Sequence, residues 1–292
     1  MSPERYGPFP YSPIIDRPSL SWPNGKKLAV WIIPNIEFYP YDVEYQLGVG
    51  GLGAIQPNVM EWSRRDYGNR VGIFRLMDLF AERNIRATVA LNSDICTEHP
   101  RIIEKALELD WEFMGHGETN TVLLPQLAED KERGVIARTL SAIETATGNR
   151  PRGWLGPGLT ETSRTLEHLA AEGVRYVADF VNDDQPYFFD VGSPPLVSIP
   201  YTMELNDTHK MNRQFYSPTA FADLISAQFE TLYAESQNSL RVMAIALHPW
   251  ISGAPHTVKA LGAVLDAMAR HDGVWFATGE EIIEGFVAAA NG

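Results

Sequence analysis

The sequence lacks several features that would assign it to common functional classes. Its 292 residues contain one cysteine, Cys96, which excludes an intrachain disulfide and a thiolate metal cluster. Lysine and arginine number 24 against 37 aspartates and glutamates, and the net charge of −13 argues against a nucleic-acid partner, because phosphate binding depends on clustered basic side chains. No uncharged run of about 18 apolar residues occurs, so we expect no membrane partner. Since the N-terminus also lacks the basic-then-apolar layout of a secretory signal, we expect a cytoplasmic protein.

Three well-known sequence motifs are missing as well. The chain contains no GxGxxG or GxxxxGKS pattern, so a dinucleotide site or a P-loop has no support. It contains no GxSxG elbow, which argues against a serine-hydrolase triad. Cys96 has no evident histidine partner in sequence, and we interpret it as a small buried residue rather than a nucleophile.

What the sequence does contain is a repeated alternation of short apolar runs with segments of helical periodicity. The apolar runs predict strands at Leu28–Ile33, Ala87–Leu91, Trp111–Met114, Gly153–Leu155, Val174–Phe180, Leu196–Ile199, Arg241–Leu247 and Val274–Ala277. Between them, helices are predicted at 71–83, 100–109, 129–147, 161–172, 218–235, 258–270 and 280–290. Strands interleaved with helices pair in parallel through right-handed crossovers. We therefore expect an α/β protein built as a deformed (β/α) barrel of about seven to eight parallel strands.

The length of the chain fits one such barrel. With 45% hydrophobic residues the chain can bury one large core, and we expect a single domain over residues 1–292. An aromatic, proline-rich N-terminal arm over residues 1–25 precedes the first strand. A second irregular segment, the Tyr- and Gly-rich connection from Phe38 to about Asn69, is long enough to be functional or to carry small elements of its own.

Polar side chains follow the carboxyl ends of nearly all the predicted strands. In chain order they are Asn35 and Glu37, then Asn92, Ser93 and Asp94, then His116, Glu118 and Asn120, then Trp154, then Asn182, Asp183 and Asp184, then Glu204, Asn206 and Asp207, then His248, and last Thr278 and Glu280. In a parallel barrel these strand ends meet at one mouth, which is where active sites lie. A carboxylate or imidazole to activate water, a second group to protonate a leaving nitrogen, and amides to bind carbonyl oxygens together suit the hydrolysis of a polar bond.

Each candidate also has a purely structural interpretation. His116 and His248 follow apolar runs, and either could be a buried histidine bonded to the backbone. Glu37 ends the run IIPNIE, where a charge is costly unless it is paired or functional. One of the residues Asp183 and Asp184 is expected only to turn the loop before Pro186. Four further histidines, His99, His168, His209 and His271, are expected to be mostly solvated.

Four blocks of the sequence resemble the polysaccharide deacetylase (NodB-homology) superfamily, in its branch of allantoinase-like and cyclic-imide-hydrolase-like enzymes. They are RVGIFRLMDLFAERNIRATVAL (70–91), HGETN (116–120), RGWLGPGLTETSRTLEHLAAEGVRYVADFVNDDQPY (152–187), and PYTMELND (200–207) together with IALHPWISGAPH (245–256). The resemblance implies a NodB-like deformed barrel in which activated water attacks an amide carbonyl.

The same resemblance bears on the cofactor. Sugar deacetylases of this superfamily hold a divalent metal with an aspartate of the first strand and two histidines of an HxxxH motif. At the matching positions this chain has Asn35 and Glu37, and its HxxxH reads His116 to Asn120, so the second imidazole is missing. That loss weakens a site for zinc or a similar ion. Resemblance to the allantoinase-like branch implies no obligatory metal; a weakly held divalent metal would be bound by Glu37 and His116, with Glu118 as a substitute ligand.

The resulting hypothesis is a carbon–nitrogen hydrolase that opens a small cyclic amide, imide or ureide. Glu37 and His116 would activate water, and His248 would stabilise the oxyanion or protonate the leaving nitrogen. The residues expected to bind the substrate are Asn35, Asn120, Trp154, Asp184, Asn206 and Asp207, with the ring over Trp154 and its NH and C=O edges read by Asn120 and Asp207. Two alternatives stay open: a metal-dependent N-deacetylase of an acetylated sugar, and a catalytically silent relative that binds a small ligand.

The expected partners are a small-molecule substrate and further copies of the same chain. A homo-oligomer is the usual state of related enzymes. The aromatic arm could wrap a neighbouring subunit or pack across the floor of its own barrel.

Overall fold

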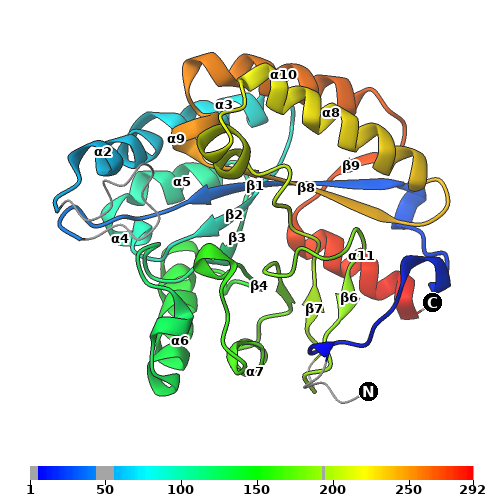
Figure 1. The fold of residues 1–292 in the computed structure, drawn as a ribbon, viewed down its shortest axis with the longest axis horizontal. Coiled ribbons are helices and arrows are strands. Elements are labelled where there is room, and N and C mark those ends of the chain that lie inside the picture. Colours follow the sequence, from blue (N-terminus) through cyan, green and yellow to red (C-terminus); the bar gives the residue numbers. More distant parts are fainter. Residues whose placement is uncertain (1–5, 44–55, 193–194, 292) are drawn as a thin grey trace.

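The computed structural model describes residues 6–43, 56–192 and 195–291. One nine-stranded sheet runs through them in the order β6-β7-β5-β4-β3-β2-β1-β8, and β9 pairs with β1 (Figure 1). The strands are β1 (Leu28–Ile36), β2 (Thr88–Leu91), β3 (Glu112–Gly115), β4 (Gly153–Trp154), β5 (Tyr176–Val177), β6 (Tyr187–Phe188), β7 (Val197–Ser198), β8 (Arg241–Leu247) and β9 (Val274–Phe276). All pairings are parallel except that of β6 with β7. The predicted α/β fold with a deformed, mostly parallel barrel is confirmed, and β6 is a strand that the sequence pattern did not indicate.

Helices surround this curled sheet. They are α2 (Val59–Tyr67), α3 (Ile73–Ala81), α4 (Ile95–Glu98), α5 (Pro100–Glu108), α6 (Glu129–Thr147), α7 (Thr165–Ala171), α8 (Pro218–Glu235), α9 (Pro249–Ser252), α10 (Pro255–Ala269) and α11 (Gly279–Asn291). Shorter turns are η1 (Ile14–Asp16), η2 (Pro23–Gly25), η4 (Leu124–Gln126) and η5 (Pro157–Leu159), and two π-helical turns are η3 (Gly68–Gly72) and η6 (Thr208–Arg213). No helix in the described ranges is long and apolar enough to cross a membrane.

The ends of the long helices follow from local chemistry. The hydroxyl of Ser217 accepts a hydrogen bond from the backbone N–H of Ala220 at 3.1 Å, and Pro218 opens α8 with its fixed φ. Gly148 ends α6 in the left-handed conformation at φ 79°, which favours glycine. In the first long connection, α2 and η3 fill the second half, and the positions 44–55 lie outside the described residues.

Alternate residues of β1 face two different cores. Leu28, Val30, Ile32 and Ile36 belong to the outer core, which they share with residues of α3, α5, α8 and α10. Ala29, Trp31 and Ile33 belong to the inner core enclosed by the curled sheet. Side chains two residues apart along a strand lie on the same face. The residues 35 and 37 therefore continue the inner row to the carboxyl end of β1.

The same alternation directs two histidines inward. On β3, Met114 packs in the inner core, so His116 continues the inner row just past the strand. On β8, Ala244 and Ala246 pack in the inner core, so His248 does the same. Three chemically active side chains thus converge because each follows the inner face of a parallel strand.

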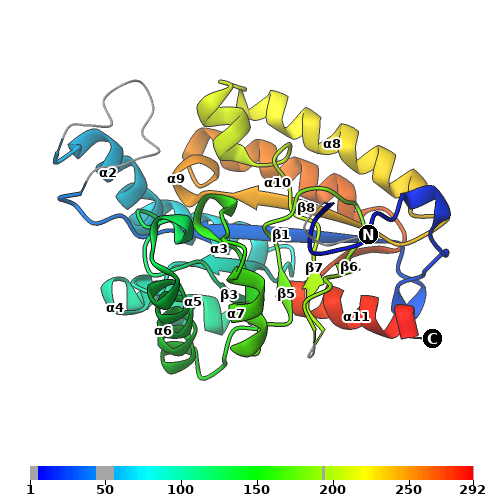
Figure 2. The ribbon, with the colours of Figure 1, turned by 60° about the horizontal axis from the view of Figure 1, so that its bottom comes forward.

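The helices divide the molecule into two sides. The helices α3, α8 and α10 lie together on one side of β1 and β8, and α6 and α7 lie on the opposite side (Figure 1). Figure 2 shows α2 at one end of the long strands and α11 beside β5 and β7 at the other. The carboxyl ends of β1 and β8 point toward the α2 end (Figure 1).

The described part of the N-terminal arm packs against its own chain. The ring of Phe9 contacts three aromatic rings at centroid distances of 5.7, 4.9 and 6.1 Å, those of Phe180, Tyr187 and Phe189. A guanidinium nitrogen of Arg17 lies 2.6 Å from a carboxylate oxygen of Asp183. These contacts correspond to the intramolecular alternative for the arm, whose first five residues lie outside the described ranges.

Candidate active site

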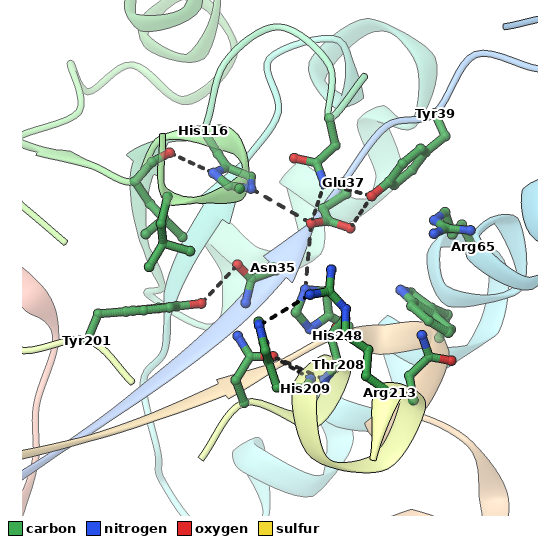
Figure 3. Close-up of a pocket in the computed structure, with 17 residues that line it drawn as sticks. Asn35, Glu37, Tyr39, Arg65, His116, Tyr201, Thr208, His209, Arg213 and His248 are labelled. Atoms are coloured by element: carbon green, nitrogen blue, oxygen red, sulfur yellow. Dashed lines mark hydrogen bonds and ion pairs between the residues drawn. The ribbon is translucent and has the colours of Figure 1, made fainter. Parts of the chain in front are cut away.

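A pocket opens at the carboxyl ends of β1, β3 and β8. It holds about 620 Å³, including space open to solvent at its mouth. Its lining consists of Asn35, Glu37, Tyr39, Arg65, His116, Asn120, Leu155, Gly158, Leu159, Tyr201, Asn206, Thr208, His209, Asn212, Arg213, His248 and Trp250 (Figure 3). Six of the predicted site residues therefore lie together here: Asn35, Glu37, His116, Asn120, Asn206 and His248.

Glu37 lies at the centre of this group. Its Oε1 accepts a hydrogen bond from Asn120 Nδ2 at 2.7 Å, and its Oε2 accepts one from the Tyr39 hydroxyl at 3.0 Å. The Nε2 atoms of His116 and His248 lie 3.8 and 3.6 Å from Oε1, and Figure 3 shows both rings directed at the carboxylate. Burial alone would raise the pKa of Glu37, but the positive charge of His248 and hydrogen bonds to the carboxylate outweigh it and hold this pKa well below its usual range. Glu37 is therefore ionised.

His248 is held from behind by a buried carboxylate. Its Nδ1 lies 2.7 Å from Asp207 Oδ1, and its backbone N–H donates to Asp207 Oδ2 at 2.7 Å. The Ser252 hydroxyl donates a third bond to Asp207 at 2.6 Å. Burial opposes charge on the ring, yet Asp207 and Glu37 together raise the pKa of His248 to about 10. At neutral pH His248 is an imidazolium that presents Nε2–H to the pocket.

His116 has a different partner behind its ring. Its Nδ1 lies 2.6 Å from the carbonyl oxygen of Leu155, and a carbonyl oxygen only accepts hydrogen bonds. Nδ1 therefore carries a hydrogen, and in the neutral form of the ring Nε2 presents its lone pair to the pocket. One imidazole is arranged as a base and the other as an acid, which is the pairing that acid–base catalysis requires.

The turn after β3 depends on a glycine. Gly117 has φ 72°, a conformation that favours glycine, and a Cβ atom at this position would lie 2.8 Å from Cγ of Pro157. The turn carries His116 and Asn120 to the pocket together.

The amide Nδ2 of Asn120 donates to Glu37 and, at 2.6 Å, to the Tyr39 hydroxyl, whereas its Oδ1 is buried with no hydrogen-bond partner among the described residues. A buried acceptor of this kind is costly unless a ligand N–H completes it.

The structure does not bring Trp154 into the pocket. Its side chain is fully buried in the core formed with α6 and α7, on the outer face of β4. A Cβ atom at Gly115 would lie 2.7 Å from the Trp154 ring, which shows how closely the indole packs under β3. The prediction that a substrate ring lies over Trp154 is corrected accordingly: aromatic walls come instead from Tyr39, Tyr201 and Trp250.

Asp207 and Asp184 also differ from their predicted places. Asp207 is fully buried and its carboxylate binds His248 and Ser252, so it positions the imidazole rather than binding an edge of the substrate.

The carbonyl of Asp184 accepts a hydrogen bond from the backbone of Val242, near the amino end of β8. At a rise of about 3.3 Å per residue, this places Asp184 on the order of 20 Å from His248 along the strand. The segment leaves the sheet after β5 and passes to the opposite end of the barrel, so Asp184 does not reach the pocket.

Several pocket residues were not predicted from the sequence. They are Tyr39, Arg65, Tyr201, His209, Arg213 and Trp250. His209, expected in solvent, lies on η6 at the pocket wall, where burial lowers its pKa and Arg213 approaches its Nε2 at 3.5 Å (Figure 3). The sequence offered a signal for three of them, because Trp250 lies two residues beyond His248, and η6, which carries His209 and Arg213, follows the PYTMELND block directly.

A divalent metal is the cofactor implied by the sugar deacetylases, and the residues present do not fit their site. Asn120 lies where the second imidazole is expected, and it donates to Glu37 instead of offering a lone pair. Both oxygens of Glu37 already accept hydrogen bonds, from Asn120 and Tyr39. Within the described ranges no group of three or more His, Cys, Asp or Glu side chains is arranged to hold a metal ion. We derive no catalytic step through a metal.

Comparison with known proteins shows which families this chain resembles. Residues 65–177 match the polysaccharide deacetylase family model. A Schizosaccharomyces pombe protein whose description assigns it to the polysaccharide deacetylases is 25% identical, with 91% of this chain and 92% of that protein aligned. The peptidoglycan deacetylase of Helicobacter pylori is 23% identical, with 85% of this chain and 95% of that protein aligned. The crystal structure of Puue allantoinase has a TM-score of 0.84 to this fold at 25% identity, covering 93% of this chain and 94% of that one.

Deacetylation of an amide and opening of a ureide ring both break a carbon–nitrogen bond. The matches therefore support a hydrolase that acts on carbon–nitrogen bonds. They also confirm the superfamily that the four sequence blocks indicate. Residues 65–177 match the polysaccharide deacetylase family, and the chain shares its fold with a polysaccharide deacetylase and with an allantoinase.

Proposed function

We propose that the protein opens a small cyclic amide, imide or ureide by hydrolysis. The observation that carries this proposal is the carboxylate of Glu37 between two imidazoles, of which His116 offers a lone pair and His248 a proton. The likeness to an allantoinase structure over nearly the whole chain supports the cyclic substrate.

The geometry supports a direct attack by water. A water molecule bound to Glu37 Oε1 loses a proton to Nε2 of His116 as its oxygen bonds to the carbonyl carbon. The oxyanion of the tetrahedral intermediate is stabilised by the positive charge of His248, which then gives its Nε2 proton to the leaving nitrogen. The carbon–nitrogen bond breaks, and the open product carries a new carboxyl group and an N–H group.

The pocket suits a flat ring with polar edges. Tyr39, Tyr201 and Trp250 supply aromatic walls. The unpaired Oδ1 of Asn120 is available to accept from a ring N–H. A ring that carries both N–H and C=O groups on its edge matches this arrangement better than the extended chain of an acetylated polysaccharide.

The proposal is tested by hydrolysis of a small panel before and after exhaustive chelation. The panel contains succinimide, dihydrouracil, hydantoin, allantoin and an N-acetylglucosamine oligomer. We expect ring opening of at least one cyclic compound, measured by chromatography, at a rate that survives chelation. Loss of all ring opening after chelation would contradict the metal-independent mechanism, and no hydrolysis of any compound would favour a silent ligand-binding relative.

A metal-dependent N-deacetylase is the second candidate, and the family match over residues 65–177 favours it. It predicts release of acetate from the N-acetylglucosamine oligomer, stopped by chelation and restored by zinc or cobalt. Glu37 and His116 would then act as metal ligands, and Asn120 would have to turn its Oδ1 toward the ion.

A further inference from the structure

A buried carboxylate lies behind His116, outside the pocket. Asp179 follows β5, and only 8% of its surface is exposed. Its Oδ1 accepts a hydrogen bond from the backbone N–H of Gly156 at 2.7 Å. The carbonyl of the same peptide group, that of Leu155, binds Nδ1 of His116 at 2.6 Å. One planar peptide group therefore connects the carboxylate of Asp179 to the imidazole of His116.

Hydrogen bonds in such a chain strengthen one another. A negative charge that accepts from the N–H of a peptide repels electron density toward the carbonyl oxygen, which becomes a better acceptor. The charge on Asp179 thus favours the His116 tautomer with hydrogen on Nδ1. Glu37 opposes this preference, because a hydrogen on Nε2 could be shared with its Oε1 at 3.8 Å. The shorter contact at Nδ1 decides the tautomer.

The local sequence permits the close approach of Asp179. Gly156 has no side chain, and a Cβ atom there would lie 3.0 Å from Asp179 Oδ2 and 2.8 Å from the carbonyl oxygen of Thr160. Any larger residue would push the peptide group away from the carboxylate. Glycine at position 156 and aspartate at position 179 therefore belong to one arrangement.

A second carboxyl group keeps Asp179 ionised. Oδ2 of Asp179 and Oε1 of Glu161 are buried without an N–H or hydroxyl partner in the described part of the chain, and the two carboxyl groups are within hydrogen-bonding reach of each other. Burial and the neighbouring charge of Asp179 raise the pKa of Glu161 to about 10. Burial also raises the pKa of Asp179, to about 6, so above that pH the pair shares one proton, held by Glu161, and Asp179 carries the negative charge.

We propose that Asp179 is a positioning residue that sets the tautomer of His116 through the Leu155–Gly156 peptide group. The arrangement is the counterpart of Asp207 behind His248, with a peptide group inserted between acid and base. Its effect on turnover rests on the proposed function, in which His116 is the base. Its effect on the tautomer does not.

The test is nitrogen-15 NMR of the histidine rings in the full-length protein, with the His116 signals assigned by their loss in His116→Gln. In the wild type we expect the Nδ1–H tautomer. Asp179→Asn retains an oxygen that can accept from Gly156 N–H but removes the charge, so we expect the Nε2–H tautomer to grow at the expense of Nδ1–H. Glu161→Gln is the matched control: its amide still donates to Asp179, the charge on Asp179 remains, and the His116 tautomer should not change.

With an active substrate, Asp179→Asn should lower kcat by about ten- to a hundredfold with KM nearly unchanged, less than the loss from a directly bonded aspartate. An Nε2–H tautomer in the wild type would overturn the proposal without any variant, and so would an unchanged His116 spectrum in folded Asp179→Asn. A shifted tautomer in a protein that hydrolyses nothing would retain this inference and reject the proposed function. Normal hydrolysis by an Asp179→Asn protein whose His116 tautomer is unchanged would reject this inference and leave the proposed function in place.

Discussion

At the scale of single residues, the site depends on what lies behind each imidazole. A carbonyl oxygen behind His116 leaves a lone pair on the pocket side, and a carboxylate behind His248 leaves a proton there. Glu37, between them, keeps His248 charged, and in the proposed reaction it orders the attacking water. The two histidines have the same side chain, but different groups lie at their Nδ1 atoms, and for that reason we propose opposite roles for them.

Replacement of the base should abolish most of the activity. His116→Gln removes the lone pair that accepts the proton from water, and we expect kcat/KM to fall by about 10²- to 10⁴-fold on any active substrate of the panel. His256→Gln, at an exposed site at the start of α10, is the matched control and should retain full activity. Circular dichroism checks the fold, and activity retained by a folded His116→Gln protein would refute the role of His116.

The pH dependence of the reaction should report His248. Because the pKa of His248 is raised to about 10, the ring is protonated below that pH, and acid catalysis is lost as the pH rises through it. Asp207→Asn removes one of the two charges that raise this pKa, so the alkaline limb of a kcat/KM profile should move to lower pH. Ser252→Ala removes a hydrogen bond to Asp207 but no charge, and the alkaline limb of its kcat/KM profile should remain at the wild-type pH. An alkaline limb that does not move in Asp207→Asn would show that another group produces it.

At the scale of elements, long segments were predictable and short ones were not. The bounds of α6, α8 and β8 agree with the sequence prediction residue for residue, because these elements have enough turns or alternations to define a period. The inward direction of Glu37, His116 and His248 follows from the same alternation. β4 has only two residues and no alternation to read, and for that reason Trp154 was assigned to the wrong face. The places of Asp184 and of η6 depend on where loops cross the barrel, which no local pattern encodes.

The contact between η3 and α9 offers a test at this scale. A Cβ atom at Gly72 would lie 2.1 Å from the carbonyl oxygen of Pro249, and α9 begins directly after His248. We expect Gly72→Ala to lower the free energy of unfolding by about 1 to 3 kcal/mol through overpacking, and to lower activity by displacing His248. Gly134→Ala on α6 is the control, since its nearest neighbour is the flexible end of Arg138 at 3.1 Å. Gly134→Ala should leave the free energy of unfolding unchanged or raise it by up to about 1 kcal/mol. Urea unfolding measures the stability of both variants. A Gly72→Ala protein as stable as the wild type would contradict the close packing.

At the scale of the whole molecule, the pocket and the aromatic arm lie toward opposite ends of β8. The pocket lies at the carboxyl ends of β1 and β8, whereas the aromatic arm and the segment around Asp184 lie near the amino end of β8. Exposed apolar side chains such as Tyr11 and Ile15 occur on that arm. A subunit that associates through the arm would leave the pocket mouth open to substrate.

The predicted homo-oligomer is tested by light scattering after size exclusion. One chain has a mass of 32.6 kDa, and we expect a larger particle, with a dimer of about twice that mass as the commonest form. Tyr11→Ser together with Ile15→Ser should reduce the mass to that of one chain if the arm forms the contact. A monomeric wild type would refute the prediction.

The two-faced burial of β1 has a consequence for how such enzymes diverge. Every side chain of this strand is buried, and the inner row ends in Asn35 and Glu37. Deletion of one residue within β1 would exchange the two rows, turning Glu37 toward the outer core and apolar side chains into the pocket. A change of length within this strand would therefore remove Glu37 from the pocket. The length of β1 is therefore fixed by the pocket as well as by the two cores that the strand separates.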